Sequence, residues 1–408
     1  MDNQLDSIVE PSEYTTSQNR SNLWRLTLAQ ALSGANAVVV YATGAIVGNM
    51  LAPSSILATL PISIFVVGMA VCVFPVGEIA FRYGRRAAFL VGSGAGVLTG
   101  LLAMAALLTG WFWLFCLSTF FGGAYAAVVL SFRFAATDGL PVHKRPQALS
   151  LVMAGGIVAG IIGPQLVTQT MHLWPQKMFA ATFLAQAIVA LLAGFVLLGV
   201  HSPAPKKNRE QRGRSLSEIV IQPRFISAVM CGAASYMIMN FLMTAAPLAM
   251  HMHGHSQESS NLGIQWHVIA MYAPSFFTGK LISRFGATKI SALGILLTGL
   301  SAVIGLIGED VLHFWSLLIL LGLGWNFGFL GASALVLECH EAAEKNRVQS
   351  VNDFIIFGLM AIGSFSSGGI LSSYGWHTVL LVSFVPLVLA IITLGSARRR
   401  PLTKEEYS

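Results

Sequence analysis

The sequence predicts an all-α, polytopic membrane protein whose twelve transmembrane helices form two pseudo-symmetric six-helix bundles. Hydrophobic residues make up 55% of the 408 residues and charged residues only 10%, and the mean hydropathy is +0.71. An ordinary soluble domain carries about 25% charged residues. Apolar segments of about 20 to 25 residues recur along the chain, and each is long enough to cross roughly 30 Å of hydrocarbon as a helix.

An internal repeat predicts the two bundles. The run GEIAFRYGRR begins at Gly77, and a similar run, GKLISRFGATK, begins 202 positions later (279 − 77) at Gly279. The motif residues are Gly77, Arg82, Gly84, Arg85 and Arg86 in the first run and Gly279, Arg284 and Gly286 in the second. Repeated membrane segments are typical of secondary transporters, whose substrate site lies where the halves meet.

Twelve apolar spans follow one another, and basic residues mark every second loop. The spans cover residues 25–47, 56–80, 87–109, 112–136, 147–169, 177–200, 225–248, 263–283, 288–308, 312–337, 348–370 and 376–396. Lys and Arg follow each even-numbered span, at 82–86, 144–145, 206–224, 284–289, 345–347 and 398–400. The positive-inside rule makes these loops cytoplasmic, and an even number of spans puts both termini on that side.

The spans set the expected domain boundaries. Residues 1–22 are polar and lack the basic and apolar regions of a signal peptide, so they form a cytoplasmic tail. The first bundle covers residues 23–200 and the second covers 225–396. Between them, residues 201–224 carry Pro203, Pro205 and six Lys or Arg residues, which is typical of a solvated cytoplasmic linker. Residues 397–408 form a second cytoplasmic tail.

Charge and cysteine content argue against several other functions. The net charge is +7, but the basic residues are scattered through short loops, so we expect no nucleic-acid partner. Three of the four cysteines fall inside spans and Cys339 lies just beyond the span 312–337. They have no metal-type spacing, so we interpret them as packing residues. The histidines of the run His251–His255 lie in a loop on the opposite side, where a dedicated metal site is not expected. We therefore predict no metal and no cofactor.

The motif between the second and third spans resembles the signature of the major facilitator superfamily. The repeated motif, the twelve spans, the basic central linker and the loop charges together extend this resemblance over the whole chain. It implies a monomeric carrier whose two halves rock around a central site. No GxxxxGK[ST] motif for nucleotide binding occurs in the chain. The compact length suggests a bacterial inner membrane.

The resemblance also implies a gate at the cytoplasmic side. The family usually has Asp before the motif arginine, but Phe81 and Ser283 stand there in this chain. We therefore expect Asp353 to pair with Arg82 and Arg85, to carry protons, or to do both. Arg133 lies eleven residues beyond Gly122, about 16 Å along a helix, and should pair with Asp138 or snorkel near the cytoplasmic interface.

Polar and aromatic residues near the middle of the spans are the candidate substrate ligands. They are Asn36, Tyr125, Tyr236, Asn240, Tyr272, Trp325 and Asn326. None carries a charge at neutral pH, whereas a buried ionic solute would need a counter-charge. Amides beside aromatic faces favour a neutral, ring-containing solute. The alternative for each residue is packing between helices.

The predicted function is transport of a small neutral aromatic or heterocyclic solute, such as a vitamin-like compound, by alternating access. The partners would be this solute, the lipid bilayer and, as a candidate coupling ion, the proton. A proton-coupled exporter of drugs or metabolites is the first alternative, but Ser118 stands where such exporters often carry Arg, and the motif at Gly163 and Pro164 matches theirs only in part. A membrane sensor is the second. The spans show no cluster of catalytic groups, so we do not expect an enzyme.

Overall fold

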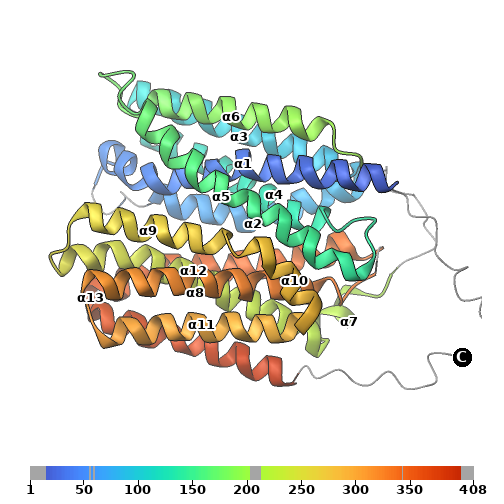
Figure 1. The fold of residues 1–408 in the computed structure, drawn as a ribbon. Coiled ribbons are helices and arrows are strands. Elements are labelled where there is room, and N and C mark those ends of the chain that lie inside the picture. The colour runs from blue at the N-terminus through green and yellow to red at the C-terminus, as the bar shows by residue number, and fades with distance from the viewer. Residues whose placement is uncertain (1–14, 55–56, 58–59, 203–212, 342, 397–408) are drawn as a thin grey trace, which may run out of the picture.

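A computed structural model describes residues 15–54, 57, 60–202, 213–341 and 343–396 (Figure 1). Within these ranges the chain is helical with connecting turns and contains no strand, which confirms the all-α prediction. Residues 1–14 of the expected N-terminal tail, 203–212 of the expected linker and the C-terminal tail at 397–408 lie outside the described residues.

The first six long helices pack side by side in the upper part of Figure 1. They are α1 Thr16–Leu51, α2 Leu60–Tyr83, α3 Arg85–Thr109, α4 Phe112–Ala135, α5 Arg145–Thr170 and α6 Ala180–Leu198, with a short 3-10 helix, η2 Val142–Lys144, before α5. Helix α1 begins within the segment expected to be a tail, because Thr15 and Gln18 form a capping box that starts the helix there.

The remaining helices form the lower part of Figure 1. They are α7 Leu216–Val220, α8 Pro223–Met252, α9 Gln257–Tyr272, α10 Ser275–Phe285, α11 Ala287–Ile307, α12 Val311–Val336 and α13 Lys345–Ser396. Helix α13 contains two helices joined at Gly375, where φ is 79°. We call α1–α6 the first bundle and α8–α13 the second bundle.

Among the described residues, eleven helices are long and apolar enough to span a membrane. The prediction of one continuous helix over 263–283 is wrong, because this segment is divided between α9 and α10. The division falls at Ala273 and Pro274. Proline lacks the backbone N–H that an uninterrupted helix requires and crowds the preceding turn. The apolar composition from which a span is predicted continues across the break, so composition alone does not reveal it.

The motif glycines of the repeat occupy equivalent places in the two bundles. Gly84 and Gly286 immediately precede α3 and α11, with φ of 86° and 88°, a conformation that glycine adopts without strain. Gly77 on α2 lies against Ser350 on α13, and Gly279 on α10 lies against the Pro146 carbonyl on α5. A Cβ atom at either glycine would collide with the facing bundle. The repeat therefore marks two close contacts between the bundles.

Candidate functional site

Five aromatic side chains of the second bundle form a continuous group that we call the central aromatic cluster. They are Tyr236 on α8, Tyr272 at the end of α9, Trp325 and Phe329 on α12, and Phe357 on α13. The Trp325 ring lies 5.5 Å from Tyr236 and 5.7 Å from Tyr272, both edge to face. It stacks on Phe329 at 5.1 Å. These are favourable geometries for aromatic pairs, so the rings hold one another in place.

The first bundle reaches the central aromatic cluster through α1 and α5. The Tyr41 hydroxyl donates to Asn240 Oδ1 on α8 at 3.5 Å, and the Tyr41 ring packs edge-on against Phe65 at 5.5 Å. On α5, Gly156 faces the Tyr272 ring so closely that a Cβ atom would collide with it. The cluster therefore lies at the interface between the bundles, where a carrier of this architecture would bind its solute.

Two buried hydrogen-bond donors of this site have no partner among the described residues. They are Nδ2 of Asn240 and Nε1 of Trp325. Asn240 is 2% exposed and Trp325 is fully buried. Buried donors are nearly always paired, and an unpaired one costs about 1–3 kcal/mol. This site therefore has hydrogen-bonding capacity that the described residues do not use.

The structure does not bring Asn36 and Tyr125 to the central aromatic cluster. Asn36 donates to the Gly122 carbonyl at 3.2 Å and accepts from Gln186. The Tyr125 hydroxyl donates to Ser33 Oγ at 2.6 Å. These bonds all join helices of the first bundle. Asn36 and Tyr125 are thus satisfied inside one bundle, as packing residues would be.

Asn326 supports the break between α9 and α10. Its Nδ2 donates to the Met271 carbonyl at 2.6 Å and to Ser275 Oγ at 2.7 Å, and its Oδ1 accepts from Thr278 at 2.6 Å. The break interrupts the regular helical hydrogen bonds, and one amide on α12 bridges it. In this structure Asn326 has its hydrogen bonds within the second bundle.

Asp353 and Arg133 form a buried ion pair between the bundles. Arg133 Nη2 lies 2.6 Å from Asp353 Oδ1, and the two side chains are 0% and 6% exposed. Arg133 also donates to Ser333 Oγ at 3.2 Å and to the Leu130 carbonyl. Its guanidinium lies 4.6 Å from the centre of the Phe329 ring, next to the central aromatic cluster. The α4 helix directs Arg133 into the interface, so the prediction that it snorkels or pairs with Asp138 is wrong.

The motif arginines have other partners. Arg82 pairs with Glu78 on its own helix, at the surface, and Arg85 Nε lies 2.7 Å from Asp138 Oδ2. The predicted pairing of Asp353 with Arg82 and Arg85 is therefore wrong, because Asp353 forms its ion pair with Arg133. Arg86 and Arg284 are exposed.

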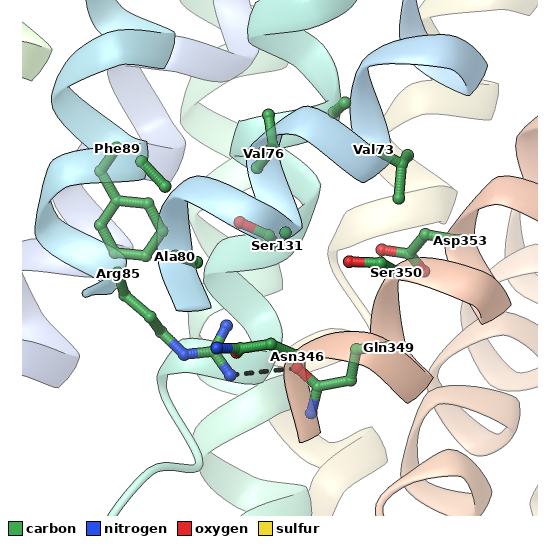
Figure 2. A pocket seen from close by; sticks show the side chains of 13 residues that line it. Val73, Val76, Ala80, Arg85, Phe89, Ser131, Asn346, Gln349, Ser350 and Asp353 are labelled. Atoms are coloured by element: carbon green, nitrogen blue, oxygen red, sulfur yellow. Dashed lines mark hydrogen bonds between the residues drawn. The ribbon is translucent and has the colours of Figure 1, made fainter. Parts of the chain in front are cut away.

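Arg85 and Asp138 extend the contact between the bundles. Lys345 of α13 lies 3.2 Å from Asp138. Arg85 Nη2 donates to Gln349 at 3.0 Å (Figure 2). Burial favours a higher pKa for Asp138, but Arg85 and Lys345 outweigh this effect and lower that pKa. We call this end of the molecule, with Arg85, Asp138 and Lys345, the basic end.

A small cavity separates this network from Asp353. It has a volume of about 30 Å³ and lies among α2, α3, α4 and α13 (Figure 2). Ser131, Asn346, Ser350 and Asp353 give it polar walls. Such a volume is close to that of one water molecule and far below what a drug-sized solute needs. The basic end is thus closed to a solute in this structure.

Histidines gather around Glu309 at the opposite end. Glu309 Oε2 lies 3.0 Å from His253 Nε2, and Glu309 Oε1 lies 3.5 Å from His377 Nδ1. His255 Nε2 lies 2.6 Å from the Glu309 carbonyl oxygen. These contacts connect the α8–α9 loop and the α11–α12 loop of the second bundle to α13.

Sequence reasoning missed several members of the interface site. Tyr41, Phe65, Phe329 and Phe357 are aromatic residues inside apolar spans, where most such residues simply pack. One signal was available, because Phe329 follows Trp325 by four residues and therefore lies on the same helix face. The contacts of Tyr41 and Phe357 depend on how separate helices are rotated against one another.

Comparisons with known proteins agree with the fold. The model of the family described as Major Facilitator Superfamily matches residues 26–273 and 228–407. The chain is 47% identical to the riboflavin transporter RfnT of Brucella anthropi over 388 residues, which cover 93% of this chain and 98% of that protein. It is 29% identical to YdeG, an uncharacterized MFS-type transporter of Bacillus subtilis, over 97% of this chain and 96% of YdeG.

Solved structures of transporters share the fold. The proton:xylose symporter XylE superposes with a TM-score of 0.76 at 15% identity, covering 94% of this chain and 96% of XylE. The human organic anion transporter MFSD10 superposes with a TM-score of 0.75 at 13% identity, covering 92% of this chain and 99% of MFSD10. At these identities the likeness concerns the fold alone.

Proposed function

This chain belongs to the major facilitator superfamily, and we propose that it transports riboflavin, or a closely related neutral flavin, by alternating access between its two bundles. The family assignment confirms the resemblance seen in the sequence and makes the protein a membrane transporter rather than an enzyme. The choice of solute rests on the riboflavin transporter RfnT, to which nearly the whole chain is similar, and on the chemistry of the central aromatic cluster.

The uncharged aromatic site between the bundles is the observation that supports this solute best. The isoalloxazine ring of a flavin is flat, neutral and aromatic, so it suits stacking or edge contacts with Tyr and Trp side chains. Arg133, which borders the cluster at Phe329, is already neutralised by Asp353. An ionic solute would need a counter-charge that the cluster itself does not offer.

The contacts at the basic end support the transport mechanism that we propose. Gly77 against Ser350, Arg133 with Asp353, and Lys345 with Asp138 all join the first bundle to the second. A solute could leave toward this end only after these contacts part. The loops of this end carry the excess of Lys and Arg, so we assign it to the cytoplasmic side, together with both termini.

We extend the proposal to the coupling ion, the oligomeric state and the membrane. A buried carboxylate at the moving interface is costly and is commonly functional, so Asp353 is our candidate for carrying a proton. The two bundles of a single chain form the interface site between them, which is compatible with a monomer. The bacterial relatives favour a bacterial inner membrane.

Thermal stabilisation of the purified protein tests the choice of solute. A ligand that binds only the folded protein raises the melting temperature of the protein. At ligand concentrations above Kd, the stabilisation grows with the logarithm of the ligand concentration. We expect riboflavin to stabilise the protein in this way and xylose, glutamate and a quaternary ammonium drug to have no effect. Stabilisation by one of these other solutes, with no effect of riboflavin, would refute the proposed solute.

A further inference from the structure

We propose that Asn240 and Trp325 bind one edge of the solute ring by donating two hydrogen bonds to adjacent acceptor atoms. In a flavin these acceptors would be the ring nitrogen N5 and the neighbouring C4 carbonyl oxygen. The inference rests on the proposed function and deepens it, because it names the solute atoms to which the site would donate hydrogen bonds.

These two donors differ from the buried amides of neighbouring helices. Asn326 and Asn36 are also buried amides, and each bonds to groups of its own bundle. By contrast, Asn240 Nδ2 and Trp325 Nε1 have no partner among the described residues. Two idle donors in one site are costly to keep buried, unless a ligand supplies the acceptors during the transport cycle.

The donors border the same group of rings. Tyr236 lies one turn before Asn240 on α8, and its ring lies 5.5 Å from that of Trp325 on α12. Asn240 and Tyr236 therefore share the face of α8 that is turned toward Trp325. A flat ring inserted among these side chains would meet an amide from α8 and an indole N–H from α12.

Neighbouring side chains orient both donors. The Tyr41 hydroxyl bonds to Oδ1 of Asn240, which leaves Nδ2 as the free end of the amide. Trp325 is stacked on Phe329 at 5.1 Å and is flanked by Tyr236 and Tyr272. Preorganised donors lose little entropy when a ligand binds, so they can contribute to affinity and to selection.

The arrangement of donors selects for acceptors. An indole N–H can only donate a hydrogen bond, and the free end of the Asn240 amide likewise donates. A hydrocarbon ring would leave both donors unpaired. In riboflavin, N5 and the C4 carbonyl lie side by side on the edge opposite N10, which bears the ribityl chain. This edge is flat, carries two acceptors and is not obstructed by the chain.

The test compares riboflavin with 5-deazariboflavin, in which a C–H group replaces N5. Calorimetric titration of the purified full-length protein should give an affinity about tenfold lower for the deaza compound, as expected for one lost hydrogen bond to a buried donor. Trp325→Phe and Asn240→Leu should each weaken riboflavin binding by a similar factor. In the variant that has lost the donor to N5, the preference for riboflavin over 5-deazariboflavin should disappear.

Trp376→Phe is the matched control. Trp376 is also buried with an unpartnered Nε1, but it packs on Phe314, outside the central aromatic cluster, with ring centres 5.4 Å apart. This change removes the same chemical group and should leave riboflavin affinity unaltered. The comparison of the two flavins uses the wild-type protein, so it does not depend on the folding of any variant.

The outcomes separate this inference from the proposed function. Equal affinity of the wild type for the two flavins, or unchanged riboflavin affinity in both Trp325→Phe and Asn240→Leu, would overturn the inference while leaving riboflavin as the solute. Failure of riboflavin to bind the wild type at all would overturn the proposed function itself.

Discussion

Arg133 of the first bundle and Asp353 of the second form an ion pair of 2.6 Å in which both side chains are withdrawn from solvent. Because the two residues belong to different bundles, the pair exists only while these bundles are in contact at the basic end. A carrier that opens this end must separate the charges or neutralise one of them. The free energy of this ion pair therefore contributes to the energy needed to open the basic end during transport.

Breaking the pair on one side should cost more than removing it entirely. Arg133→Met leaves the carboxylate of Asp353 buried without its counter-charge, a change that typically costs about 3–5 kcal/mol. We expect this single variant to lower the melting temperature strongly. The double variant Arg133→Met/Asp353→Leu should recover most of that loss, since it leaves no buried charge at the pair. A double variant no more stable than the single one would contradict this account.

The same pair allows a test of proton coupling. Asp353→Asn keeps the shape of the side chain but removes its ability to take up a proton. We expect this variant in proteoliposomes to lose the acceleration of uptake by a pH gradient, while exchange of internal for external solute continues at a reduced rate. Acceleration equal to that of the wild type would exclude Asp353 as the proton carrier.

The contact of Gly77 with Ser350 can be tested by a compensating substitution. Gly77→Ala places a Cβ atom against Ser350 Oγ and should force α2 away from α13, which opens the basic end and impairs transport. Replacing Ser350 by Ala removes the colliding oxygen, so Gly77→Ala/Ser350→Ala should regain part of the transport rate. Gly94→Ala on α3 is the control, because a Cβ atom there meets no neighbouring atom within 4 Å.

Asn326 should behave as a structural residue. Asn326→Ala removes the amide that bridges the break between α9 and α10, leaving Met271, Ser275 and Thr278 without it. We expect a loss of roughly 1–3 kcal/mol in stability, seen as a lower melting temperature. An unchanged melting temperature with a selectively raised KM would instead identify Asn326 as a substrate ligand.

The ion pair of Arg214 and Glu344 should make stability depend on pH. Hydrogen bonds from Arg214 lower the pKa of Glu344 to about 2, whereas an unfolded chain would titrate it near its ordinary value of 4.5. The lowered pKa means that this stabilisation is present above pH 4.5 and is lost as the pH falls toward 2.

Melting temperatures of wild type and Glu344→Gln should therefore differ most at neutral pH and converge between pH 4.5 and 2. Glu341→Gln, at the exposed position three residues away, is the control and should leave the melting temperature at neutral pH close to that of the wild type. A constant gap between wild type and Glu344→Gln down to pH 2 would contradict the assignment.

Local and repeated features of the fold could be predicted from the sequence, whereas pairings between bundles could not. Gly84 and Gly286 of the repeated motif mark equivalent turns, because their positive φ is a local backbone requirement. The partner of Asp353 depends on the rotation of α4 and α13, which lie far apart in the sequence. The break at Pro274 escaped prediction because apolar composition continues across it.

The proposed substrate residues show the same division. Tyr236, Asn240, Tyr272 and Trp325 meet at the interface, as expected for the middle of their spans. Asn36 and Tyr125 lie at similar depth along their helices but point into the first bundle. Depth follows from position in the sequence, but the side of the helix that faces the interface depends on packing.

Counterflow of riboflavin through the purified protein is the most direct test of the central claim. Proteoliposomes loaded with unlabelled riboflavin and diluted into labelled riboflavin should accumulate the label transiently, without any ion gradient. Trp325→Ala vesicles with the same amount of folded protein should accumulate much less. If wild-type vesicles accumulate no more label than protein-free ones, while the protein remains folded, this chain is not a riboflavin carrier.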